Sequence, residues 1–460
     1  MPNKPEPIYG RIPVGWDLLE LRDLISDGKA ALQTGPFGTM LHASAYVFSG
    51  TPVVAVKNIG DNCLVHDDLA RINSSDLQRL ERYKLREGDI LFSRKGNVER
   101  RALVRSQEAD WLQGSDCIRL RILTNDIEPT FVSYALGTKA YREWILRNAQ
   151  GATMPSLNQE IIGRIPLPLP KSSEQRAIMG ILATLDDKIE LNMHMNETLA
   201  GMTNAVFKSW FVDFDPVRSK TESGSVSILG RYQGLFPNSF QDSELGNIPT
   251  GWRVARLGDL CGRVAMGPFG SDIKADNFVE AGVPVIRGGN LTHGFVDEGF
   301  VYISEQKADE LRNSNAFPGD IVITHRGTLG QVGLIPKRSR FPRYVVSQSQ
   351  MLLSVDDRQA TTNYIFVYLS SVHGQHQLLA NTNQTGVPAI ARPVTSLKAI
   401  RLVLPPPTVL KSFEELVGPL IDRIDANLAE TRSLISLRDM LLSQLISGKL
   451  RLRDCEKALL

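Results

Sequence analysis

Two predicted strands, at 89–93 and 320–324, each end in basic side chains next to a glycine. These side chains are Arg94 and Lys95 in the first case and His325 and Arg326 in the second. A cation held at the end of a strand is suited to contact a phosphate group or the edge of a guanine base. A solvated hairpin tip explains this feature equally well.

A glycine-rich turn also occurs twice. Gly-Pro-Phe-Gly is found at 35–38 and at 267–270. Glycine allows close approach of the backbone, so amide groups in such a turn can reach a phosphate, although a turn that only caps the core is the commoner case. Together, these loops and their neighbours offer the following candidates for contact with DNA: Phe37, Lys57, Asn58, Arg94, Lys95, Asn97, Phe269, Ser271, Arg287, Asn290, His325, Arg326 and Thr328.

A run of basic residues lies in the second half of the chain. It consists of Lys337, Arg338, Arg340 and Arg343, interleaved with Phe341 and Tyr344. Such a stripe can bind a polyanion, but a solvated hairpin edge has the same composition. The net charge of +2 excludes a histone-like polycation and leaves local binding of nucleic acid possible.

The sequence lacks the motifs of common catalytic centres. It contains no GxxxxGK[ST] phosphate loop, no GxGxxG fingerprint, no HExxH and no GxSxG. The Asn-Pro-Pro-aromatic tetrad of amino-methyltransferases is absent as well. His373 and His376 are three residues apart but have no evident third ligand. These absences favour a binding or scaffold protein, and we expect the chain itself to bind no cofactor and no metal.

The composition is that of a folded, soluble protein. Of 460 residues, 42% are hydrophobic and 22% are charged, which excludes a disordered or fibrous chain. No apolar stretch reaches eighteen residues, and the first residues are rich in proline and charge rather than apolar as in a signal peptide. The four cysteines lie far apart without a CxxC pair. We therefore expect a cytoplasmic protein.

The chain repeats itself once. Ile-Pro-x-Gly-Trp occurs at 12–16 and 248–252, and Gly-Asp-Ile at 88–90 and 319–321. The separation between matching segments is nearly constant, at about 231 to 236 residues. Several ordered matches at one separation indicate an internal duplication.

Each copy has two parts. The first part has short β-branched runs separated by glycine, proline and asparagine, with a helix predicted late in it, at 130–148 and 362–380, which favours a mixed α/β domain around a strongly bent sheet. The second part has apolar residues at three- and four-residue steps. Some forty residues at this period predict a helix roughly 60 Å long. Two such helices in one chain are expected to pair as a coiled coil.

This pattern defines five predicted regions. They are a first globular domain at 1–170, a long helix at 171–215, a flexible linker at 216–247, a second globular domain at 248–407 and a second long helix at 408–452. The predicted fold class is α+β: two similar mixed α/β domains separated by two long antiparallel coiled-coil helices, with an internal pseudo-two-fold repeat. Asn192 and Asn427 lie at equivalent places near each helical seam, where a solvated position is the commoner case and a buried asparagine would fix the register.

The sequence resembles the specificity (S) subunits of type I restriction–modification systems over nearly its whole length. The resemblance rests mainly on the first long helix and its flanks, with Ile-Pro-Leu-Pro-Leu-Pro at 165–170, Leu-Asp-Asp-Lys-Ile-Glu at 185–190 and Ser-Trp-Phe-Val-Asp-Phe at 209–214. The Ile-Pro-x-Gly-Trp openings and Gly-Asp-Ile strands resemble the target recognition domains of that family. The second copy departs from the family pattern after Pro388.

The resemblance implies a non-catalytic DNA-binding subunit. Each recognition domain would read one half of a bipartite double-stranded DNA target, and the helices would set the spacing and dock two modification (methyltransferase) subunits. S-adenosylmethionine, ATP and Mg²⁺ would bind to partner subunits, which include the restriction (motor and endonuclease) subunits. The alternatives are a coiled-coil scaffold with two peptide- or carbohydrate-binding domains and, less favoured, a nuclease. DNA binding through several phosphates should weaken steeply with salt, which separates these hypotheses.

Overall fold

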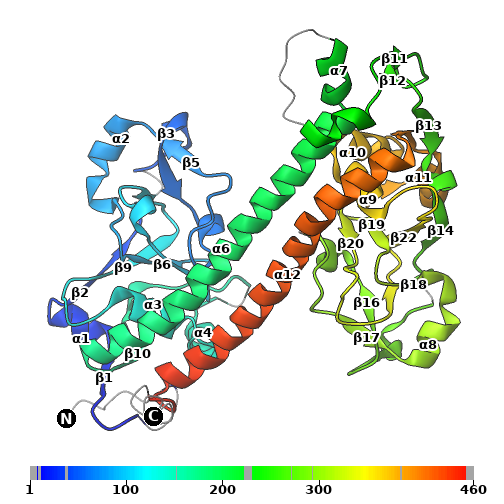
Figure 1. The fold of residues 1–460 in the computed structure, drawn as a ribbon. Helices are drawn as coiled ribbons and strands as arrows, with labels where there is room; N and C mark the ends of the chain where they lie inside the picture. The colour runs from blue at the N-terminus through cyan, green and yellow to red at the C-terminus, as the bar shows by residue number, and fades with distance from the viewer. Residues whose placement is uncertain are drawn as a thin grey trace, which may run out of the picture. The chain divides into compact units, whose positions relative to one another are not determined.

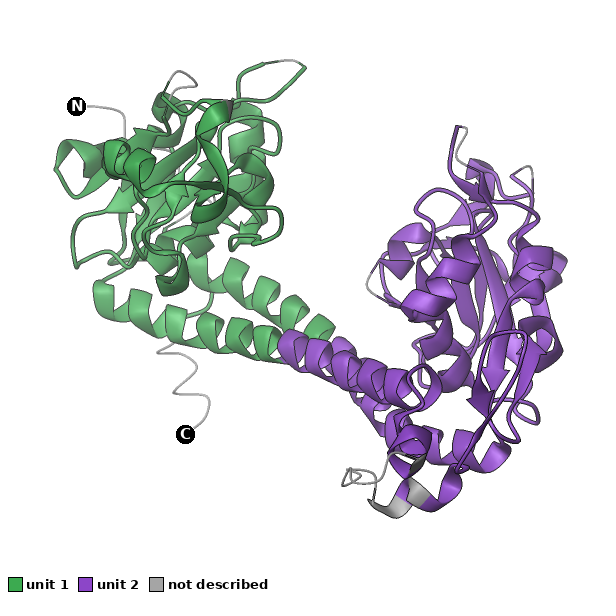
Figure 2. Cartoon of the chain, turned by 90° about the horizontal axis from the view of Figure 1, so that it is seen from above, with its two compact units in different colours: residues 1–191, 430–460 green, residues 192–429 purple. Residues whose placement is uncertain are grey.

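The computed structural model describes residues 8, 12–36, 40–151, 153–221, 230–270, 272–292, 294–383 and 386–451 (Figure 1). The chain forms two compact units: residues 1–191 with 430–460 make unit 1, and residues 192–429 make unit 2 (Figure 2). Each unit holds one globular domain and part of both long helices. These helices are α6 (Ser172–Phe211) and α12 (Pro407–Ile446), each of 40 residues.

Three sheets build the globular domain of unit 1. Its strands are β1 (Asp17–Glu20), β2 (Ala30–Thr34), β3 (Tyr46–Val54), β4 (Asp61–Asn62), β5 (Ala70–Ile72), β6 (Ile90–Ser93), β7 (Arg101–Leu103), β8 (Leu112–Gln113), β9 (Cys117–Ile122) and β10 (Pro166–Leu169). They are ordered β2-β9-β6-β7-β4, β5-β3-β8 and β1-β10. The helices are α1 (Leu21–Ser26), α2 (Ser74–Arg79), α3 (Pro129–Leu136), α4 (Lys139–Asn148) and α5 (Gln159–Gly163).

Strand β6 shows why this domain has more than one core. Ile90 and Phe92 point into the main core, where they pack with α3 and with α6. Leu91 points to the opposite side and packs with Val54 and Cys117 in a second core between the two larger sheets. A strand buried on both faces is apolar at every position, which explains the continuous Ile-Leu-Phe run.

The globular domain of unit 2 repeats this plan. Its strands are β13 (Arg253–Arg256), β14 (Cys261–Met266), β15 (Phe278–Val279), β16 (Val283–Ile286), β17 (Val301–Ile303), β18 (Asn315–Ala316), β19 (Ile321–Thr324), β20 (Val332–Leu334), β21 (Tyr344–Val346), β22 (Gln350–Val355), β23 (Thr382–Asn383), β24 (Ala389–Ile390) and β25 (Arg401–Leu404). They are ordered β14-β22-β19-β20, β15-β17-β16-β21-β18, β13-β25 and β23-β24. The helices are α8 (Glu305–Glu310), α9 (Thr362–Ser370), α10 (Val372–Leu379) and α11 (Pro393–Ala399).

Equivalent strands occupy equivalent places in the two domains, which confirms the internal duplication. The order β2-β9-β6-β7 corresponds to β14-β22-β19-β20, and β5-β3-β8 corresponds to β17-β16-β21. Two details of the prediction were wrong. The single bent sheet is divided into separate sheets. The late helix of each copy is broken into two, because Gly137 in one and Ser371 in the other end the first helix and a new helix begins after them.

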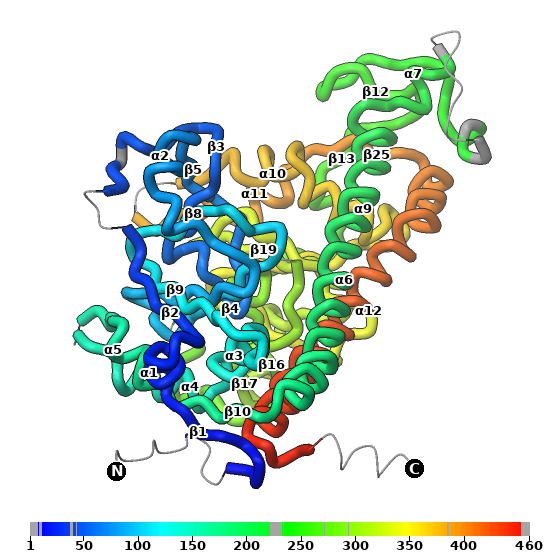
Figure 3. Tube along the Cα trace, turned by 90° about the vertical axis from the view of Figure 1, so that its left-hand side faces the viewer, coloured from blue at the N-terminus to red at the C-terminus, as the bar shows by residue number. Residues whose placement is uncertain are grey.

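The long helices run side by side and antiparallel within each unit (Figure 3). In unit 1, the early part of α6 meets the late part of α12, where Lys188 Nζ lies 3.4 Å from Glu430 Oε2. In unit 2, Asn427 Nδ2 donates a 2.9 Å hydrogen bond to Asn196 Oδ1. Asn192 and Asn427 are both buried, so these positions lie inside the seam rather than on a solvated face.

The predicted apolar stripe is not buried throughout. Ile181, Met202 and Leu437 belong to it by spacing, yet all three are exposed, Met202 to 50%. Within each unit the seam is narrower than the stripe, so one edge of the stripe remains in contact with solvent. None of the helices in the described ranges is long and apolar enough to cross a membrane.

The segment predicted as a flexible linker is folded at both ends. It contains most of α7 (Asp215–Thr221) and all of β11 (Phe240–Gln241), and β12 (Ile248–Pro249) begins directly after it. Val217 and Phe236 are buried in the core of unit 2, because apolar residues flank the polar stretch that suggested a flexible linker. The bounds of the five regions otherwise stay predictions.

Candidate DNA-contacting surface

In unit 2, three loops converge on the short segment 347–350. The Gly267 amide donates to the Gln350 carbonyl at 2.9 Å, and the His325 amide donates to the Ser349 carbonyl at 2.9 Å. The Ser347 amide in turn donates to the Ile286 carbonyl at 2.9 Å, which holds the loop that follows β16. The backbone therefore gathers most of the predicted site residues of the second copy on one surface.

Unit 1 makes the corresponding arrangement around 114–117. The Gly35 amide donates to the Cys117 carbonyl at 2.9 Å, and the Arg94 amide donates to the Asp116 carbonyl at 2.8 Å. The Gly114 amide donates to the Val54 carbonyl at 3.0 Å. Two sets of loops distant in sequence thus form the same surface twice, and we call these surfaces loop surface 1 and loop surface 2.

The first glycine of each Gly-Pro-Phe-Gly turn is required by packing. A Cβ atom on Gly35 would lie 1.8 Å from the Gly114 carbonyl oxygen, and one on Gly267 would lie 1.8 Å from the Ser347 carbonyl oxygen. No side chain fits such a space. These glycines therefore fasten each turn to the core, which agrees with the structural explanation of the motif, and in the second turn Phe269 lies at the surface.

Loop surface 2 contains a cavity beside this turn. The cavity has a volume of about 360 Å³ and is lined by Phe269, Phe278, Arg287 and Gln348, among others. Phe269 is 82% exposed, and Arg287 is exposed as well. An apolar wall with an adjacent guanidinium can hold the planar face of a base or a thymine methyl group while it contacts a phosphate or a guanine edge.

Two predicted site residues have a structural role instead. Asn58 is 1% exposed and Asn290 is 4% exposed. Asn58 accepts from the Ala55 amide and donates to the carbonyls of Val65 and Asp67, while Asn290 bonds in the same way to its own loop. With donors and acceptor occupied by backbone, neither side chain is available to DNA. Asn58 and Asn290 do occupy equivalent positions in the two copies, but what they share is a role in holding their own loops.

The cationic residues at the strand ends separate into buried and exposed positions. His325 is 5% exposed, and burial lowers its pKa, so its ring is neutral at neutral pH. Arg326 and Thr328 next to it are exposed, and Gly327 is fixed by a 2.9 Å hydrogen bond that its amide donates to the Pro388 carbonyl. Arg326 is therefore the cation that loop surface 2 offers to solvent at this strand end.

In unit 1, the corresponding cations face carboxylates. Lys95 Nζ lies 3.6 Å from Asp116 Oδ1, and Lys57 forms an ion pair with Asp68. Arg94 is half-buried and Asn97 is exposed. Such exposed pairs are weak, so Lys95 and Lys57 can exchange a carboxylate for a phosphate at little cost.

Phe37 and Ser271, the remaining candidates, lie outside the described residues. The sequence interpretation missed Asp116, Gln348 and Phe278, which lie on the loop surfaces. The available signal was positional, since polar residues precede β9 and β22 at corresponding places in the repeat.

The basic run at 337–343 does not form a continuous patch. Arg343 is held by Glu305 and by Asp309, whose Oδ1 lies 2.6 Å from Arg343 Nη1, and these bonds raise the pKa of the guanidinium. Tyr344 is buried and its hydroxyl donates to Asp297 Oδ1 at 2.8 Å. Lys337, Arg338 and Arg340 are exposed. Only part of the predicted stripe is therefore available to a polyanion.

No group of three or more His, Cys, Asp or Glu in the described part of the chain is arranged to hold a metal ion. Loop surface 2 thus carries the exposed ring of Phe269 and the exposed guanidinium groups of Arg287 and Arg326, whereas the described part of loop surface 1 carries the exposed lysines Lys57 and Lys95.

Comparison with known proteins agrees with this duplicated architecture. Residues 13–200 and 249–409 each match the type I restriction modification DNA specificity domain. The MjaIX type I restriction enzyme specificity subunit of Methanocaldococcus jannaschii is 23% identical over 97% of this chain and 96% of its own length. The HindI specificity subunit of Haemophilus influenzae is 24% identical over 88% of this chain and 95% of its own length.

A solved structure has the same fold. The S subunit of a type I restriction–modification system from M. genitalium aligns over 95% of this chain and 96% of its own length, with a TM-score of 0.55 and 15% identity. Two matches to one domain model cover most of the sequence, and they divide it at the same place as the repeat. The chain therefore belongs to the family of type I restriction–modification specificity subunits, with two DNA specificity domains.

Proposed function

We propose that each globular domain reads one half of a bipartite double-stranded DNA target through its loop surface, and that α6 and α12 set the distance between the half-sites. The observation that carries this proposal is the duplicated convergence of loops on 114–117 and 347–350, each with a basic residue at the neighbouring strand end. Backbone-anchored loops present side chains with little loss of conformational entropy on binding. Two such readers joined in one chain bind more tightly than either alone.

The helices supply the second half of the proposal. Exposed apolar side chains remain on them at Ile181, Leu191, Met193 and Met440, among others. Apolar groups on a long exposed helix are suited to pack against further helices. Two modification (methyltransferase) subunits are the proposed occupants, and restriction (motor and endonuclease) subunits join them. S-adenosylmethionine, ATP and Mg²⁺ bind to those partners in this proposal.

The direct test is to map methylated adenines in DNA from cells with and without this gene. A bipartite target that is methylated only when the gene is present supports the proposal, and an unchanged methylation map contradicts it. The scaffold hypothesis with peptide- or carbohydrate-binding domains is not favoured, because both globular domains match a DNA specificity domain.

The purified chain alone is expected neither to methylate nor to cleave DNA. The reason is that the sequence has no phosphate loop and no methyltransferase tetrad. Assays with DNA, S-adenosylmethionine, ATP and Mg²⁺ measure both reactions. Turnover by a verified single-subunit preparation would contradict this expectation, and restoration of activity by added partner subunits is the positive control.

Arg326→Ala is expected to weaken binding to the specific target by about 1–3 kcal/mol and to relax discrimination in one half-site only. Its exposed guanidinium lies at the end of β19 next to the anchored Gly327. Competition binding against a library of half-site substitutions measures both effects. An equal loss of affinity for all DNA sequences would show that Arg326 contacts a phosphate. No loss of affinity would show that Arg326 lies at a solvated hairpin tip without a role in binding.

Arg358→Ala is the matched control for this variant. Arg358 belongs to the same domain and is exposed. It follows the end of β22, whereas the end of β19 that carries Arg326 pairs with the start of β22, and Arg358 Nη2 lies 2.9 Å from Asp356 Oδ2. The net charge of the domain changes equally in both variants, so a difference between them reports position rather than overall charge.

A further inference from the structure

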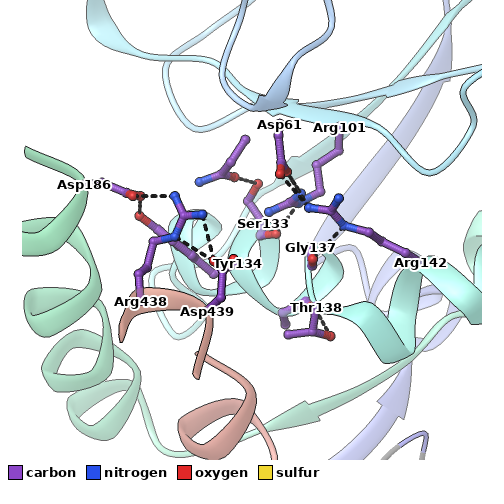
Figure 4. A network of polar contacts seen from close by, with 12 residues as sticks. Asp61, Arg101, Ser133, Tyr134, Gly137, Thr138, Arg142, Asp186, Arg438 and Asp439 are labelled. Carbon is purple, nitrogen blue, oxygen red and sulfur yellow. Dashed lines mark hydrogen bonds and ion pairs between the residues drawn. The ribbon is translucent and has the colours of Figure 1, made fainter. Parts of the chain in front are cut away.

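In unit 1, a single carboxylate joins the globular domain to both long helices. Tyr134, on α3 of the domain, is 5% exposed and its hydroxyl donates to Asp186 on α6 (Figure 4). Arg438, on α12, donates from Nη1 to the other oxygen of Asp186 at 2.8 Å. Three elements that are distant in sequence thus meet at Asp186.

The partners of Asp186 are held in their protonated forms. Burial and the hydrogen bond to Asp186 both raise the pKa of Tyr134. Burial opposes the charge of Arg438, but its hydrogen bonds to Asp186 and Asp439 outweigh this and raise its pKa. The ion pair is three-quarters buried, with side chains 23% and 22% exposed, so the contact is screened less than a surface pair.

The same network continues into the body of the domain. Arg101, on β7, is buried and donates through Nε to the carbonyl of Ser133, the residue before Tyr134. The Ser133 hydroxyl donates to Asn62 Oδ1 at 2.6 Å. The backbone that carries Tyr134 is therefore bonded to the sheet on one side, while its side chain is bonded to the helices on the other.

The Arg101 guanidinium packs against Gly137 at the edge of a cavity of about 690 Å³. A Cβ atom on Gly137 would lie 1.9 Å from the Arg101 guanidinium, so this group occupies the space directly beside the glycine. Arg101 Nη1 also lies 3.0 Å from Asp61 Oδ1, and Arg142 Nη2 lies 2.7 Å from the other oxygen of Asp61. Burial lowers the pKa of Arg101 to about 10, which leaves it charged at neutral pH.

Unit 2 joins its domain to the helices by aromatic packing, together with a 2.9 Å hydrogen bond from Asn363 Nδ2 on α9 to Glu414 Oε1 on α12. Phe207 and Phe211 on α6 and Phe413 on α12 pack against Tyr364 of α9, with ring centroids 4.9 to 6.3 Å from that of Tyr364. Aromatic packing of this kind is strong but tolerates small rotations. Hydrogen bonds to a carboxylate have a narrower range of geometry. A carboxylate on a long helix is thus bound by the domain at both junctions, and in unit 1 that carboxylate, Asp186, also binds the second long helix through Arg438.

We propose that Tyr134, Asp186 and Arg438 form an orientation lock, a set of positioning residues that fixes the angle of the first recognition domain on its helices and thereby the register of the first half-site. The inference rests on the proposed function, since register has meaning only for a bipartite target. Without the lock, the domain is still attached through its apolar core and through polar contacts to α6 such as Arg105–Glu190 and Arg176–Glu128, but Tyr134 no longer ties its angle to the Asp186–Arg438 pair. Discrimination between target spacings then weakens while half-site sequence preference is retained.

The test uses the full chain assembled with its modification subunits and DNA targets whose spacers have the native length, one base pair fewer or one more. Tyr134→Phe removes only the hydroxyl and keeps the ring in the core. Methylation of the native spacer is expected to fall about tenfold, the loss of one charge-assisted hydrogen bond. The preference for the native spacer over the altered ones is expected to fall by a similar factor, with the half-site sequences unchanged.

Lys188→Gln is the matched control. It removes an ion pair with Glu430 that joins the same two helices without contacting the domain, so spacer preference is expected to stay native. In the Tyr134→Phe background, Asp186→Asn should broaden spacer preference little further, because the three residues act as one unit. Equal loss at all three spacers, or broadening in the control, would overturn the lock. A native complex without any target preference would instead contradict the proposed function.

Discussion

Residues 1–220 produced alone are expected to form a homodimer that, with modification subunits, methylates a palindromic target made of the first half-site twice. The fragment retains the first domain and all of α6 but lacks α12. Leu185, Ile189, Leu199 and Val206, which are buried or half-buried in the intact chain, would be exposed to solvent. Met202 belongs to the same predicted stripe but is already 50% exposed. Exposure costs on the order of 1.5–3 kcal/mol for each large apolar side chain, so an uncovered stripe favours association.

The core of unit 1 shows which part of α12 must be replaced. Leu442, Leu445 and Ile446, in its last two turns, are buried with the residues of the first domain. The corresponding turns of α6 carry Phe207, Trp210 and Phe211, which occupy the core of unit 2 in the intact chain. In a dimer, antiparallel pairing of two α6 helices would bring these rings to each first domain, because a two-fold contact is self-complementary.

Light scattering measures the oligomeric state of the fragment, and methylation mapping gives its target. A stable monomer would contradict the expectation. So would a dimer that still methylates the original asymmetric target. The intact chain under the same conditions is the control for concentration-dependent association.

Trp210→Ala is expected to destabilise unit 2 by about 3–5 kcal/mol, the range for removing a large aromatic side chain from a core. Trp210 is 1% exposed, and its ring centroid lies 5.1 Å from that of Phe236 and 6.1 Å from that of Phe413. Loss of the indole ring would remove its contacts with α12, through Phe413, and with the segment 216–247, through Phe236. A fall in Tm on the order of 10 °C is expected for the transition of this unit.

Urea unfolding, followed by the circular dichroism of the backbone rather than by tryptophan fluorescence, measures this loss of unfolding free energy. Met202→Ala is the control on the same helix, two turns earlier, where the side chain is already half exposed; its effect should stay within about 0.5 kcal/mol. A loss of less than about 1 kcal/mol for Trp210→Ala would show that the ring cluster does not hold the unit together.

Several features were predictable from the sequence because they depend on neighbouring residues. The duplication follows from ordered matches such as Gly88-Asp-Ile and Gly319-Asp-Ile, and α6 and α12 follow from a three- and four-residue apolar period. The resemblance to specificity subunits rested on contiguous segments at 165–170, 185–190 and 209–214. Each of these signals is complete within a short stretch of chain.

Other features required the tertiary structure, because they depend on contacts between distant residues. Asn58 and Asn290 have amide side chains of the kind that contact DNA. Both are buried, however, and their hydrogen bonds to their own loops give them a structural role. Met202 follows the helical period, yet the seam is too narrow to cover it.

The loop surfaces and the orientation lock likewise combine residues that the sequence identifies with contacts that only the folded chain makes. The sequence by itself determined that there are two similar domains, two long helices and basic strand ends. Only packing decided that the loops meet at 114–117 and 347–350, and that Asp186 binds both Tyr134 and Arg438. The physical reason is that period and spacing are properties of the local chain, whereas burial and hydrogen-bond partners are set by which distant segments the folded core brings together.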